Sequence, residues 1–430
     1  MQRLADYFLV VGYDHDEERS GRSCGKIIQR FPDKDWPDCP FNPRIIHFCQ
    51  PQGWILSIKH EQPTFFISIL TDLDGLRHYC ACLTFHQQLL PTTNEYLNRN
   101  NLLWSDEADD TTFLLPKTQM YAPKCFVLTS KLDCFEAFRN CLGLVYTMYV
   151  EPSSDIRLET LIGNILGNCN VPPPGGHALR FSIGVDDRQV IQPAASPTVP
   201  CTGLSVYNLF KELGIDHVFT IFCAVLSDIK ILFFSKSYWK LTEACRAVES
   251  LLYPLKYCYT FIPILPFDLI EVLDAPTPFI IGVHSDQKLQ ALVNFDGLWI
   301  DLDGASVHLT ENVKLAPMPE GPYNRILSSL FQILKPDIHA ADLAFSLNGR
   351  MNSKLDSTSQ IVADYPKYKD ESNKDKQIRA IFVRLFSELF AGYRSCLLII
   401  RINPKPVISF HKASFLGYHR WVNDEFMLRV

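Results

Sequence analysis

Ile229-Lys230-Ile231-Leu232-Phe233-Phe234-Ser235 and Phe279-Ile280-Ile281-Gly282-Val283-His284-Ser285 are two short apolar runs within the stretch 227–285. Turn-forming residues bound each run, and this pattern predicts buried strands of a helix-covered parallel sheet. Between the runs, residues 237–253 place apolar side chains on one stripe at helical spacing, namely Leu241, Ala244, Cys245, Val248, Leu251 and Leu252. The stretch therefore predicts a β-α-β unit whose helix covers one sheet face, and it contains no recognisable catalytic motif.

The segment upstream of this unit predicts a small α+β domain. Gly, Pro or Asp-Gly turns separate a series of strand-like runs, at 7–13, 53–58, 64–70, 78–85 and 122–130. Asp133 with Glu136 three residues later matches a capping box, which predicts the start of a helix. A second helical pattern follows at 155–166, so a strand meander is followed by helices that pack on it.

Shifts in composition divide the rest of the chain. Proline and glycine are frequent in residues 171–201, which predicts a linker. Residues 346–376 are polar and predict a long loop, and apolar side chains at helical spacing then predict an amphipathic helix at 375–393. The expected order is an upstream lobe at 1–170, a linker at 171–201, a central α/β part at 202–321 and a helical part at 322–430.

The composition argues against several classes of protein. The 430-residue chain has a formal net charge of -6 and no basic run longer than a pair, so we expect no nucleic-acid partner. Its 14 cysteines are scattered without any C-x-x-C pair, which is typical of reduced, buried thiols in a cytosolic protein. No apolar stretch approaches the ~18 residues of a membrane span, and the first residues lack a signal-peptide pattern. We therefore expect a cytoplasmic protein without a transmembrane segment.

Short motifs that have catalytic counterparts are better explained as turns and core positions. The G-x-S-x-G string at 21–25 follows a charged loop, not the strand that a nucleophile elbow requires. The D-x-D-G strings at 72–75 and 301–304 each follow an apolar run, where Asp-Gly is the ordinary signal of a tight turn. Cys80 and Cys82 alternate along a strand without a second pair at zinc spacing. Since a P-loop and a dinucleotide fingerprint are also missing, we predict no catalytic, cofactor or metal site.

The β-α-β unit and its flanks resemble the tripartite DENN domain. The central part of the resemblance is carried by residues 226–235, 251–255, 261–266 and 275–285. Its upstream part is carried by residues 25–32 and 48–54, and its downstream part by residues 379–386 and 390–394. Residues 3–8, 12–15 and 410–412 are similar to the SET-binding-factor branch of the myotubularin-related pseudophosphatases. The resemblance extends over nearly the whole chain.

This resemblance implies a bilobal fold of mixed α/β type. A longin-like N-terminal lobe would be followed by a second lobe with a helix-covered α/β part and C-terminal helices. The implied activity is guanine-nucleotide exchange on a Rab-family small GTPase in membrane trafficking, with the switch regions of the GTPase docked between the lobes. An exchange factor breaks no covalent bond and only binds the nucleotide-free GTPase better than the loaded form, which agrees with the missing catalytic motifs.

The resemblance also sets the expected ligands and location. GDP, GTP and Mg²⁺ would be ligands of the partner GTPase and not of this chain. Lipid-binding and inactive phosphatase domains would follow Val430, and these domains or the GTPase would bring the protein to the surface of endomembranes.

GTPase contacts are expected at the ends of helices and strands, because binding residues are carried by loops on a rigid scaffold. The candidates are Arg30 and Trp54 from the first lobe and Ser227, Asp228, Lys230, Tyr257, Tyr259 and His284 from the second. Lys230 would pair with a switch carboxylate, and Asp228 would repel phosphate or compete for magnesium. Each candidate also fits a structural role, Trp54 as a core residue and Asp228 with Lys230 as a turn before a strand.

Two other functions stay open on the sequence alone. The same surface would make the protein an adaptor if it bound the loaded and the nucleotide-free GTPase equally well. A GTPase activator would need an arginine finger, for which Arg180 and Arg188 of the linker are candidates.

Overall fold

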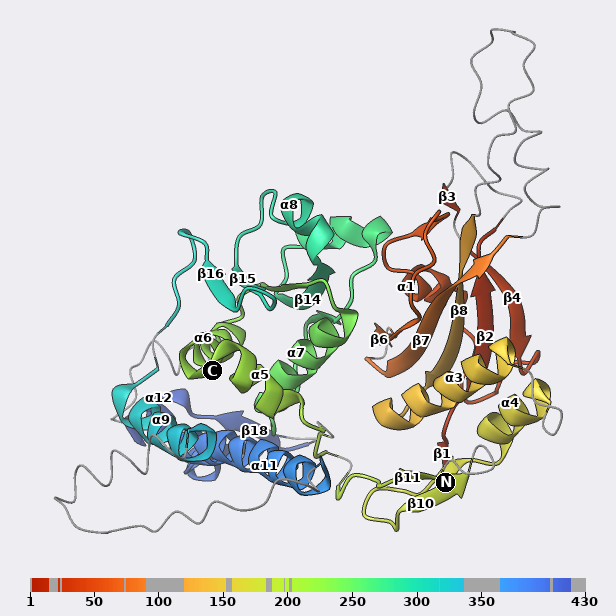
Figure 1. The fold of residues 1–430 in the computed structure, drawn as a ribbon. Helices are drawn as coiled ribbons and strands as arrows, with labels where there is room; N and C mark the ends of the chain where they lie inside the picture. Colours follow the sequence, from red (N-terminus) through yellow and green to blue (C-terminus); the bar gives the residue numbers. More distant parts are fainter. Residues whose placement is uncertain are drawn as a thin grey trace, which may run out of the picture.

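Two lobes lie side by side in the computed structural model and meet along one seam (Figure 1). The structure describes residues 2–14, 22–23, 25–72, 75–89, 120–151, 157–182, 188–196, 198–200, 203–316, 318–335, 364–402 and 405–418. Both lobes combine a sheet with helices, so the mixed α/β class and the bilobal arrangement expected from the sequence are confirmed.

The N-terminal lobe is built on a five-stranded antiparallel sheet with the order β4-β2-β8-β7-β6. The strands are β2 (Tyr7–Gly12), β4 (Lys26–Phe31), β6 (Thr64–Thr71), β7 (Arg77–Gln88) and β8 (Tyr121–Ser130). Helices α3 (Phe135–Val150) and α4 (Leu158–Gly167) pack on this sheet (Figure 1). Smaller elements complete the lobe, namely β3 (Arg22–Ser23), η1 (Pro43–Ile45), α1 (Ile46–Cys49) and β5 (Trp54–Ile55). Every residue of β2 is buried, since the strand lies inside the sheet.

Two expectations for this lobe need correction. The run at 53–58 contributes only the two-residue strand β5, whereas β4 forms where no strand pattern was recognised. Because β4 is an outer strand whose side chains are mostly exposed or half-buried, its apolar alternation is weak. The capping box is wrong: α3 begins after Cys134 without a side-chain cap, and Asp133 instead binds Arg246 of the other lobe.

The second lobe contains a mixed sheet with the order β13-β14-β12-β15-β16. Its strands are β12 (Ile231–Ser235), β13 (Thr260–Ile262), β14 (Phe279–His284), β15 (Leu298–Asp301) and β16 (Ser306–Leu309). The predicted parallel pairing of the two apolar runs is confirmed, with Ile231 opposite Ile280 and Ser235 opposite His284. Helix α7 (Tyr238–Leu251) leads from β12 to β13, and η2 (Phe267–Asp274) leads on to β14. In the sheet, β14 lies between β12 and β13, so the chain passes through β13 before it reaches β14. The predicted β-α-β unit did not include this intervening strand.

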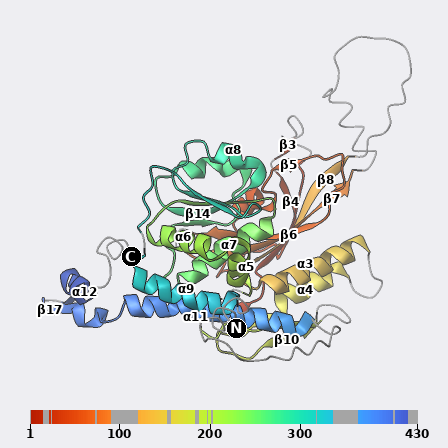
Figure 2. The ribbon, with the colours of Figure 1, turned by 60° about the vertical axis from the view of Figure 1, so that its left-hand side comes forward.

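The remaining helices of this lobe are α5 (Ser205–Leu213), α6 (Ile215–Leu226), α9 (Glu320–Leu334) and α11 (Asp364–Leu389), with the short η3 (Ser285–Gln287) and α8 (Lys288–Ala291) after β14. Of these helices, α5, α6 and α11 pack on α7, and α9 packs on α11 (Figure 2). The buried carboxylate of Asp375 on α11 accepts hydrogen bonds from the backbone N–H of Val206 and of Tyr207, both at 3.0 Å, and so caps α5.

Two regions expected to be irregular contain regular structure. Helix α11 begins at Asp364, within the predicted polar loop, because a helical turn can be polar in sequence on every face. The expected linker contains β9 (Asn170–Val171), which pairs with β1 (Gln2–Arg3), and a hairpin of β10 (Leu179–Ser182) and β11 (Arg188–Ile191). These strands are too short for their alternation to stand out between prolines. Residues 346–363 of the polar loop lie outside the described residues.

The motif at 301–304 is the predicted turn. The Asp301 carboxylate accepts hydrogen bonds from the backbone N–H of Asp303 at 3.1 Å and of Gly304 at 3.0 Å. Its other oxygen lies 2.6 Å from Lys288 Nζ, and this cation holds the pKa of Asp301 below its ordinary value although burial opposes the shift. The strings at 21–25 and 72–75 lie partly outside the described residues.

The last described residues form a small unit that follows α11. It consists of η4 (Tyr393–Cys396), the antiparallel hairpin β17 (Leu397–Ile400) and β18 (Val407–Phe410), and α12 (Lys412–Tyr418). No helix in the described ranges is long and apolar enough to cross a membrane.

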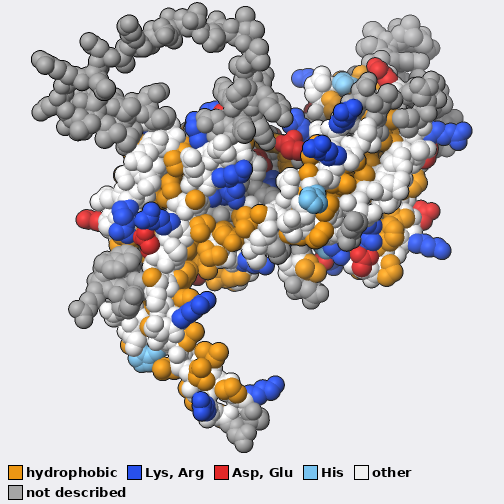
Figure 3. Space-filling view, turned by 90° about the horizontal axis from the view of Figure 1, so that it is seen from below, with side chains coloured by type: hydrophobic (Ala, Val, Ile, Leu, Met, Phe, Trp, Pro, Cys, Tyr) orange, Lys and Arg blue, Asp and Glu red, His pale blue; other side chains and the backbone are white. Residues whose placement is uncertain are grey.

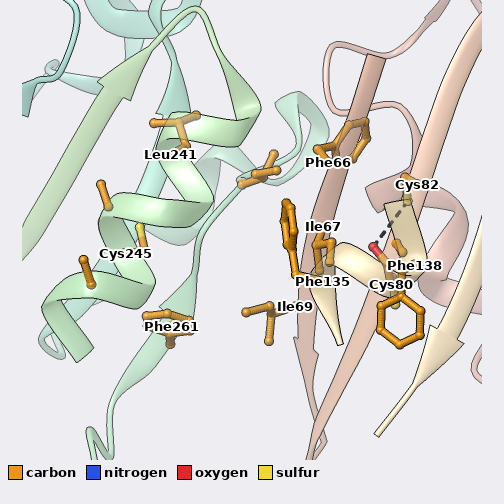
Figure 4. Packing of buried hydrophobic residues seen from close by; sticks show 14 of the residues in the cluster. Phe66, Ile67, Ile69, Cys80, Cys82, Phe135, Phe138, Leu241, Cys245 and Phe261 are labelled. Carbon is orange, nitrogen blue, oxygen red and sulfur yellow. Dashed lines mark hydrogen bonds between the residues drawn. The ribbon is translucent and has the colours of Figure 1, made fainter. Parts of the chain in front are cut away.

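One hydrophobic core extends through both lobes (Figure 4). Ile67 and Ile69 of β6 lie opposite α7 and Phe261, and all of them belong to a single cluster of buried side chains. The buried hydroxyl of Thr242 on α7 donates a hydrogen bond of 3.1 Å to the backbone oxygen of Ile67. Because apolar contacts and a buried hydrogen bond join the lobes, we expect them to behave as one body.

Candidate functional site

The seam between the lobes is closed by aromatic contacts. Phe66 of β6 lies 5.0 Å from the ring of Tyr238, and Phe135 of α3 lies 4.2 Å from the ring of Trp239. Tyr238 and Trp239 begin α7, directly after the carboxyl end of β12. A partner that recognises both lobes must therefore bind on the surface across this seam, since the seam itself is filled by side chains of the chain.

Half-buried ion pairs connect the lobes beside the aromatic contacts. Arg246 on α7 lies 2.6 Å from the Asp133 carboxylate of the first lobe and 3.2 Å from Glu243. Arg77 on β7 lies 2.6 Å from Glu249 on α7. Burial raises the pKa of Asp133, and it raises the pKa of Glu243 to about 7 although the Arg246 charge opposes the shift. The seam thus holds charged groups from both lobes, and the distances within their ion pairs depend on the relative position of the lobes.

A second polar contact between the lobes lies near the surface. Gln52 Nε2 donates a hydrogen bond of 2.9 Å to His284 Nδ1, while His284 Nε2 lies 3.1 Å from the backbone oxygen of Lys236. The backbone N–H of Phe267 donates a hydrogen bond of 2.8 Å to the oxygen of Pro51. The neutral tautomer with a proton on Nε2 satisfies both ring nitrogens of His284. We call Gln52, His284, Pro51 and Phe267 the inter-lobe bridge.

Large apolar side chains are exposed on both sides of the inter-lobe bridge. In the first lobe, Ile55 is 43% and Ile58 is 66% exposed, shortly after Gln52 in the chain. In the second lobe, Leu289 is 87% and Val293 is 64% exposed, shortly after His284. Figures 1 and 2 show α8 and the β3 and β5 pair on the same side of the molecule. We call these four residues together with the inter-lobe bridge the bridge surface.

The structure brings five of the eight candidate residues together. Ser227, Asp228 and Lys230 precede β12, and Tyr257 and Tyr259 precede β13. These strands are both parallel to β14, so all five residues lie at the amino ends of the parallel strands. These five residues are exposed or half-buried and form one edge of the sheet. This edge stays a predicted contact surface.

The electrostatics of this edge centre on one aspartate. Asp228 is exposed and has a φ of 52°, in the left-handed region that Asp tolerates better than most residues. Its charge raises the pKa of the neighbouring Tyr259 hydroxyl, and the Tyr257 and Tyr259 rings lie 5.8 Å apart. Lys230 Nζ lies 5.6 Å from the centre of the Phe279 ring. The edge therefore presents a carboxylate and a phenol hydroxyl at one place, and both can serve as polar contacts.

The other three candidates lie elsewhere. His284 is at the carboxyl end of β14 and belongs to the inter-lobe bridge. Arg30 is on β4, the sheet edge away from the seam, where it lies 2.9 Å from Asp35 and 4.9 Å from the Phe41 ring. Trp54 is 4% exposed, and a Cβ on Gly25 would lie 2.4 Å from its indole nitrogen. Packing thus explains Trp54, and a local ion pair explains Arg30.

A cavity of about 880 Å³ opens beside the seam on the α3 side. Its walls come from both lobes and include Phe65, Leu83, Arg139, Asn140, Gln189 and Trp239. The amide of Asn140 donates a hydrogen bond of 2.7 Å to Gln189 Oε1, and the Arg139 guanidinium lies 5.4 Å from the Trp239 ring. None of the lining side chains of this cavity are arranged as nucleophile and base.

Three buried thiols meet in the first lobe. The sulfur atoms of Cys49, Cys82 and Cys125 lie within 4.8 Å of one another, and none of the three residues is exposed. Burial raises the pKa of Cys82 and of Cys125, whereas hydrogen bonds from these two thiols lower the pKa of Cys49 to about 5. Sequence spacing could not reveal the cluster, because its members come from α1, β7 and β8. Its chemistry suits a soft metal ion, but no charged or imidazole ligand completes the described set.

Sequence reasoning missed most of the bridge surface. Gln52 and His284 are separated by 232 residues, and Leu289 is an ordinary apolar residue in the sequence. Only the exposure of Leu289 distinguishes it, and exposure requires the tertiary structure. The arginine-finger candidates Arg180 and Arg188 are exposed on the β10–β11 hairpin, which Figure 1 places at the opposite end of the molecule from α8.

Comparisons with known proteins match domain families to segments of this chain. The model of the uDENN domain matches residues 25–85, and the model of the DENN (AEX-3) domain matches residues 121–305. The chain is 32% identical over 393 residues to myotubularin-related protein 5 of Caenorhabditis elegans, which covers 87% of this chain and 19% of that protein. It is 24% identical over 416 residues to the DENN domain and WD repeat-containing protein SCD1 of Arabidopsis thaliana, covering 92% of this chain and 32% of that protein. The chain thus spans about a third or less of the length of these relatives.

Proposed function

Because this chain carries a uDENN domain and a DENN domain, we propose that it is a guanine-nucleotide exchange factor module for a Rab-family small GTPase. In this proposal the GTPase docks with its switch regions on the bridge surface. The observation that carries the assignment of the surface is the exposure of Leu289 and Val293 in one lobe and of Ile55 and Ile58 in the other, on both sides of the inter-lobe bridge.

The energetic requirement on such a surface is modest. A thousandfold acceleration of GDP release needs about 4 kcal/mol of preferential binding to the open, nucleotide-free GTPase. Burying one Leu or Ile side chain contributes roughly 1.5–3 kcal/mol, so two or three buried anchors supply the difference. Single exposed apolar residues are ordinary, so what supports a binding site is their presence in both lobes, where one partner bound across the seam could cover them.

The rigidity of the seam supports an exchange mechanism over simple binding. Nucleotide is held by phosphate and Mg²⁺ contacts that the switch loops organise. A surface can hold these loops in an open arrangement only if it does not yield to them. The shared core and the half-buried ion pairs of Arg246 and Arg77 provide such a surface, because separating the lobes would expose apolar area and leave charges unpaired.

The sheet edge around Asp228 and Tyr259 is the second predicted contact. It lies at the opposite ends of the parallel strands from His284, so it and the bridge surface belong to different sides of the second lobe. In our proposal the bridge surface is the main site, and Asp228 contributes only if the GTPase also reaches this edge.

Release of labelled GDP from a panel of purified Rab GTPases tests the proposal, with GTP hydrolysis followed in parallel. We expect faster release from at least one member at catalytic concentrations of this chain. Binding to a Rab without faster release would establish an adaptor instead. Faster hydrolysis that is lost on replacing Arg180 or Arg188 would establish a GTPase activator. The absence of any effect across the panel would refute the proposed activity.

A further inference from the structure

The β17–β18 hairpin exposes apolar side chains on both of its faces. On one face, Ile399 and Ile408 are directly opposite each other and are 68% and 67% exposed. On the other face, Ile400 and Val407 are paired and are 45% and 51% exposed. An isolated two-stranded hairpin is at best marginally stable in water, so a hairpin of this composition needs an apolar environment.

The position of the hairpin leaves it accessible. Among the described residues, β17 and β18 pair only with each other. Figure 2 shows β17 and α12 at the far end of α11, away from α8 and from the sheet of the first lobe. Phe410, the last residue of β18, is 46% exposed, and Ile402, just beyond β17, is 54% exposed.

The charge of this unit is opposite to that of the chain. Residues 391–418 contain no Asp or Glu, but they contain the basic residues Arg394, Arg401, Lys405 and Lys412, whereas the whole chain has a net charge of -6. All four cations are exposed. Arg401 and Lys405 lie at the tip of the hairpin, and Arg394 and Lys412 lie at its base. Figure 3 shows this protruding end with hydrophobic and basic side chains and no acidic side chain in view.

We propose that the β17–β18 hairpin docks on an anionic phospholipid surface, with its aliphatic side chains inserted at headgroup depth and its cations among the phosphates. Basic residues gain binding free energy at a negatively charged leaflet, and aliphatic side chains gain it by leaving water. The backbone groups at the open edges of the hairpin remain bonded to headgroups and water, because the hydrocarbon interior would leave them unsatisfied.

Two features favour a lipid surface over a protein partner. A protein that packed on one face of the hairpin would leave the other face in water, whereas a headgroup layer surrounds both faces. The excess of cations without one interspersed carboxylate also matches a surface of uniform negative charge, and it would oppose pairing with a second copy of the same unit. The docking would leave the bridge surface free for its partner.

Co-sedimentation of the 430-residue chain with vesicles tests this inference. We compare vesicles of phosphatidylcholine alone with vesicles of equal parts phosphatidylcholine and phosphatidylserine. The chain is expected to sediment with the mixed vesicles and not with the neutral ones, and its binding should weaken as salt increases because headgroup attraction is screened. Binding to neither kind of vesicle, or equal binding to both, would overturn the inference.

Variants of exposed residues separate the two contributions. Ile399→Asp with Ile408→Asp should weaken binding to the mixed vesicles by at least about tenfold, since two aliphatic anchors are lost. Arg401→Glu with Lys405→Glu should weaken it by about tenfold or more, since each basic residue contributes roughly fivefold. Val190→Asp, at a 60% exposed position of β11, is the matched control and should bind as the parent does.

The same variants identify the competing occupant. All of these positions are exposed, so the variants should unfold at the same urea concentration as the parent. Unchanged vesicle binding by both hairpin variants would overturn the inference. A concentration-dependent dimer in sedimentation equilibrium that disappears in the Ile399→Asp, Ile408→Asp variant, without any binding to vesicles, would show that a second copy covers the hairpin instead.

Discussion

Replacing Glu243 by Gln should make the stability of this protein less dependent on pH. Glu243 lies in the seam, where its carboxylate is 3.2 Å from Arg246 and where burial raises its pKa from 4.5 to about 7. Asp133, Glu136 and Asp375 also raise this pKa by repulsion, and Arg246 alone among the named neighbours lowers it. A Gln side chain has nearly the same shape and can still accept a hydrogen bond from Arg246, but it carries no charge to titrate.

The size of the effect follows from the shift in pKa. Because the pKa of Glu243 is higher in the folded protein than in the unfolded chain, the folded state binds its proton more tightly. The resulting stabilisation is fully present below about pH 4.5 and is lost as the pH rises through about 7. At 1.36 kcal/mol per pH unit, the parent protein should lose about 2 to 3 kcal/mol between about pH 5 and pH 8 that the variant does not lose.

Urea unfolding at several pH values measures this difference. The free energy of unfolding of the parent and of Glu243→Gln should diverge as the pH rises, with the variant the more stable protein at about pH 8. Glu159→Gln, at an exposed position of α4, is the control and should follow the parent at every pH. Parallel curves for the parent and Glu243→Gln would refute the reasoning, since they would mean that the Glu243 carboxylate is solvated in the folded protein.

Three further predictions follow from the seam and the bridge surface. Arg246→Met should lower the free energy of unfolding by about 3–5 kcal/mol at about pH 8, because it leaves the Asp133 and Glu243 carboxylates without their cation. A smaller loss at about pH 5, where Glu243 with its pKa of about 7 is protonated, is the check, and equal losses would contradict the account. Gly282→Ala should cost roughly 1–3 kcal/mol in urea unfolding, since its Cβ would lie 2.0 Å from the backbone oxygen of Pro263, and an unchanged midpoint would show that the strands separate easily. Leu289→Asp and Ile58→Asp should each slow the GDP release from the Rab GTPase that this chain stimulates by about tenfold, with unchanged urea unfolding. Full activity in both variants would exclude the bridge surface as the docking site.

Continuous apolar runs were the reliable signal in the sequence. Strands β2, β12 and β14 are buried on both faces, so nearly every residue in them is apolar and the strand is evident without a partner. Apolar side chains at helical spacing predicted helix α11. Among these side chains, Phe382 and Phe386 are buried in the core. The weakly patterned elements escaped prediction: the outer strand β4, the β10–β11 hairpin and the polar first turns of α11.

The candidate site was predictable only in part. The residues before β12 and β13 were chosen because they end elements, and the parallel pairing of the strands brings Asp228 and Tyr259 to one edge of the sheet. The partners of His284 were not predictable, since Gln52 belongs to the other lobe. Asp133 shows the same limit, because its local pattern predicted a helix cap while a more favourable charged partner, Arg246, lies on a distant helix.

The sequence by itself determined the class of the fold, the parallel strands of the stretch 227–285 and the absence of a familiar catalytic motif. These properties depend on the local alternation, length and spacing of residues, which burial of an apolar face imposes on the chain. Only the tertiary structure decided that the two lobes share one core, that β14 lies between β12 and β13, and that Leu289 is exposed beside the inter-lobe bridge. The physical reason is that packing between distant segments depends on the free energy of the apolar area that they bury and the charges that they pair together. No short window of sequence contains both segments.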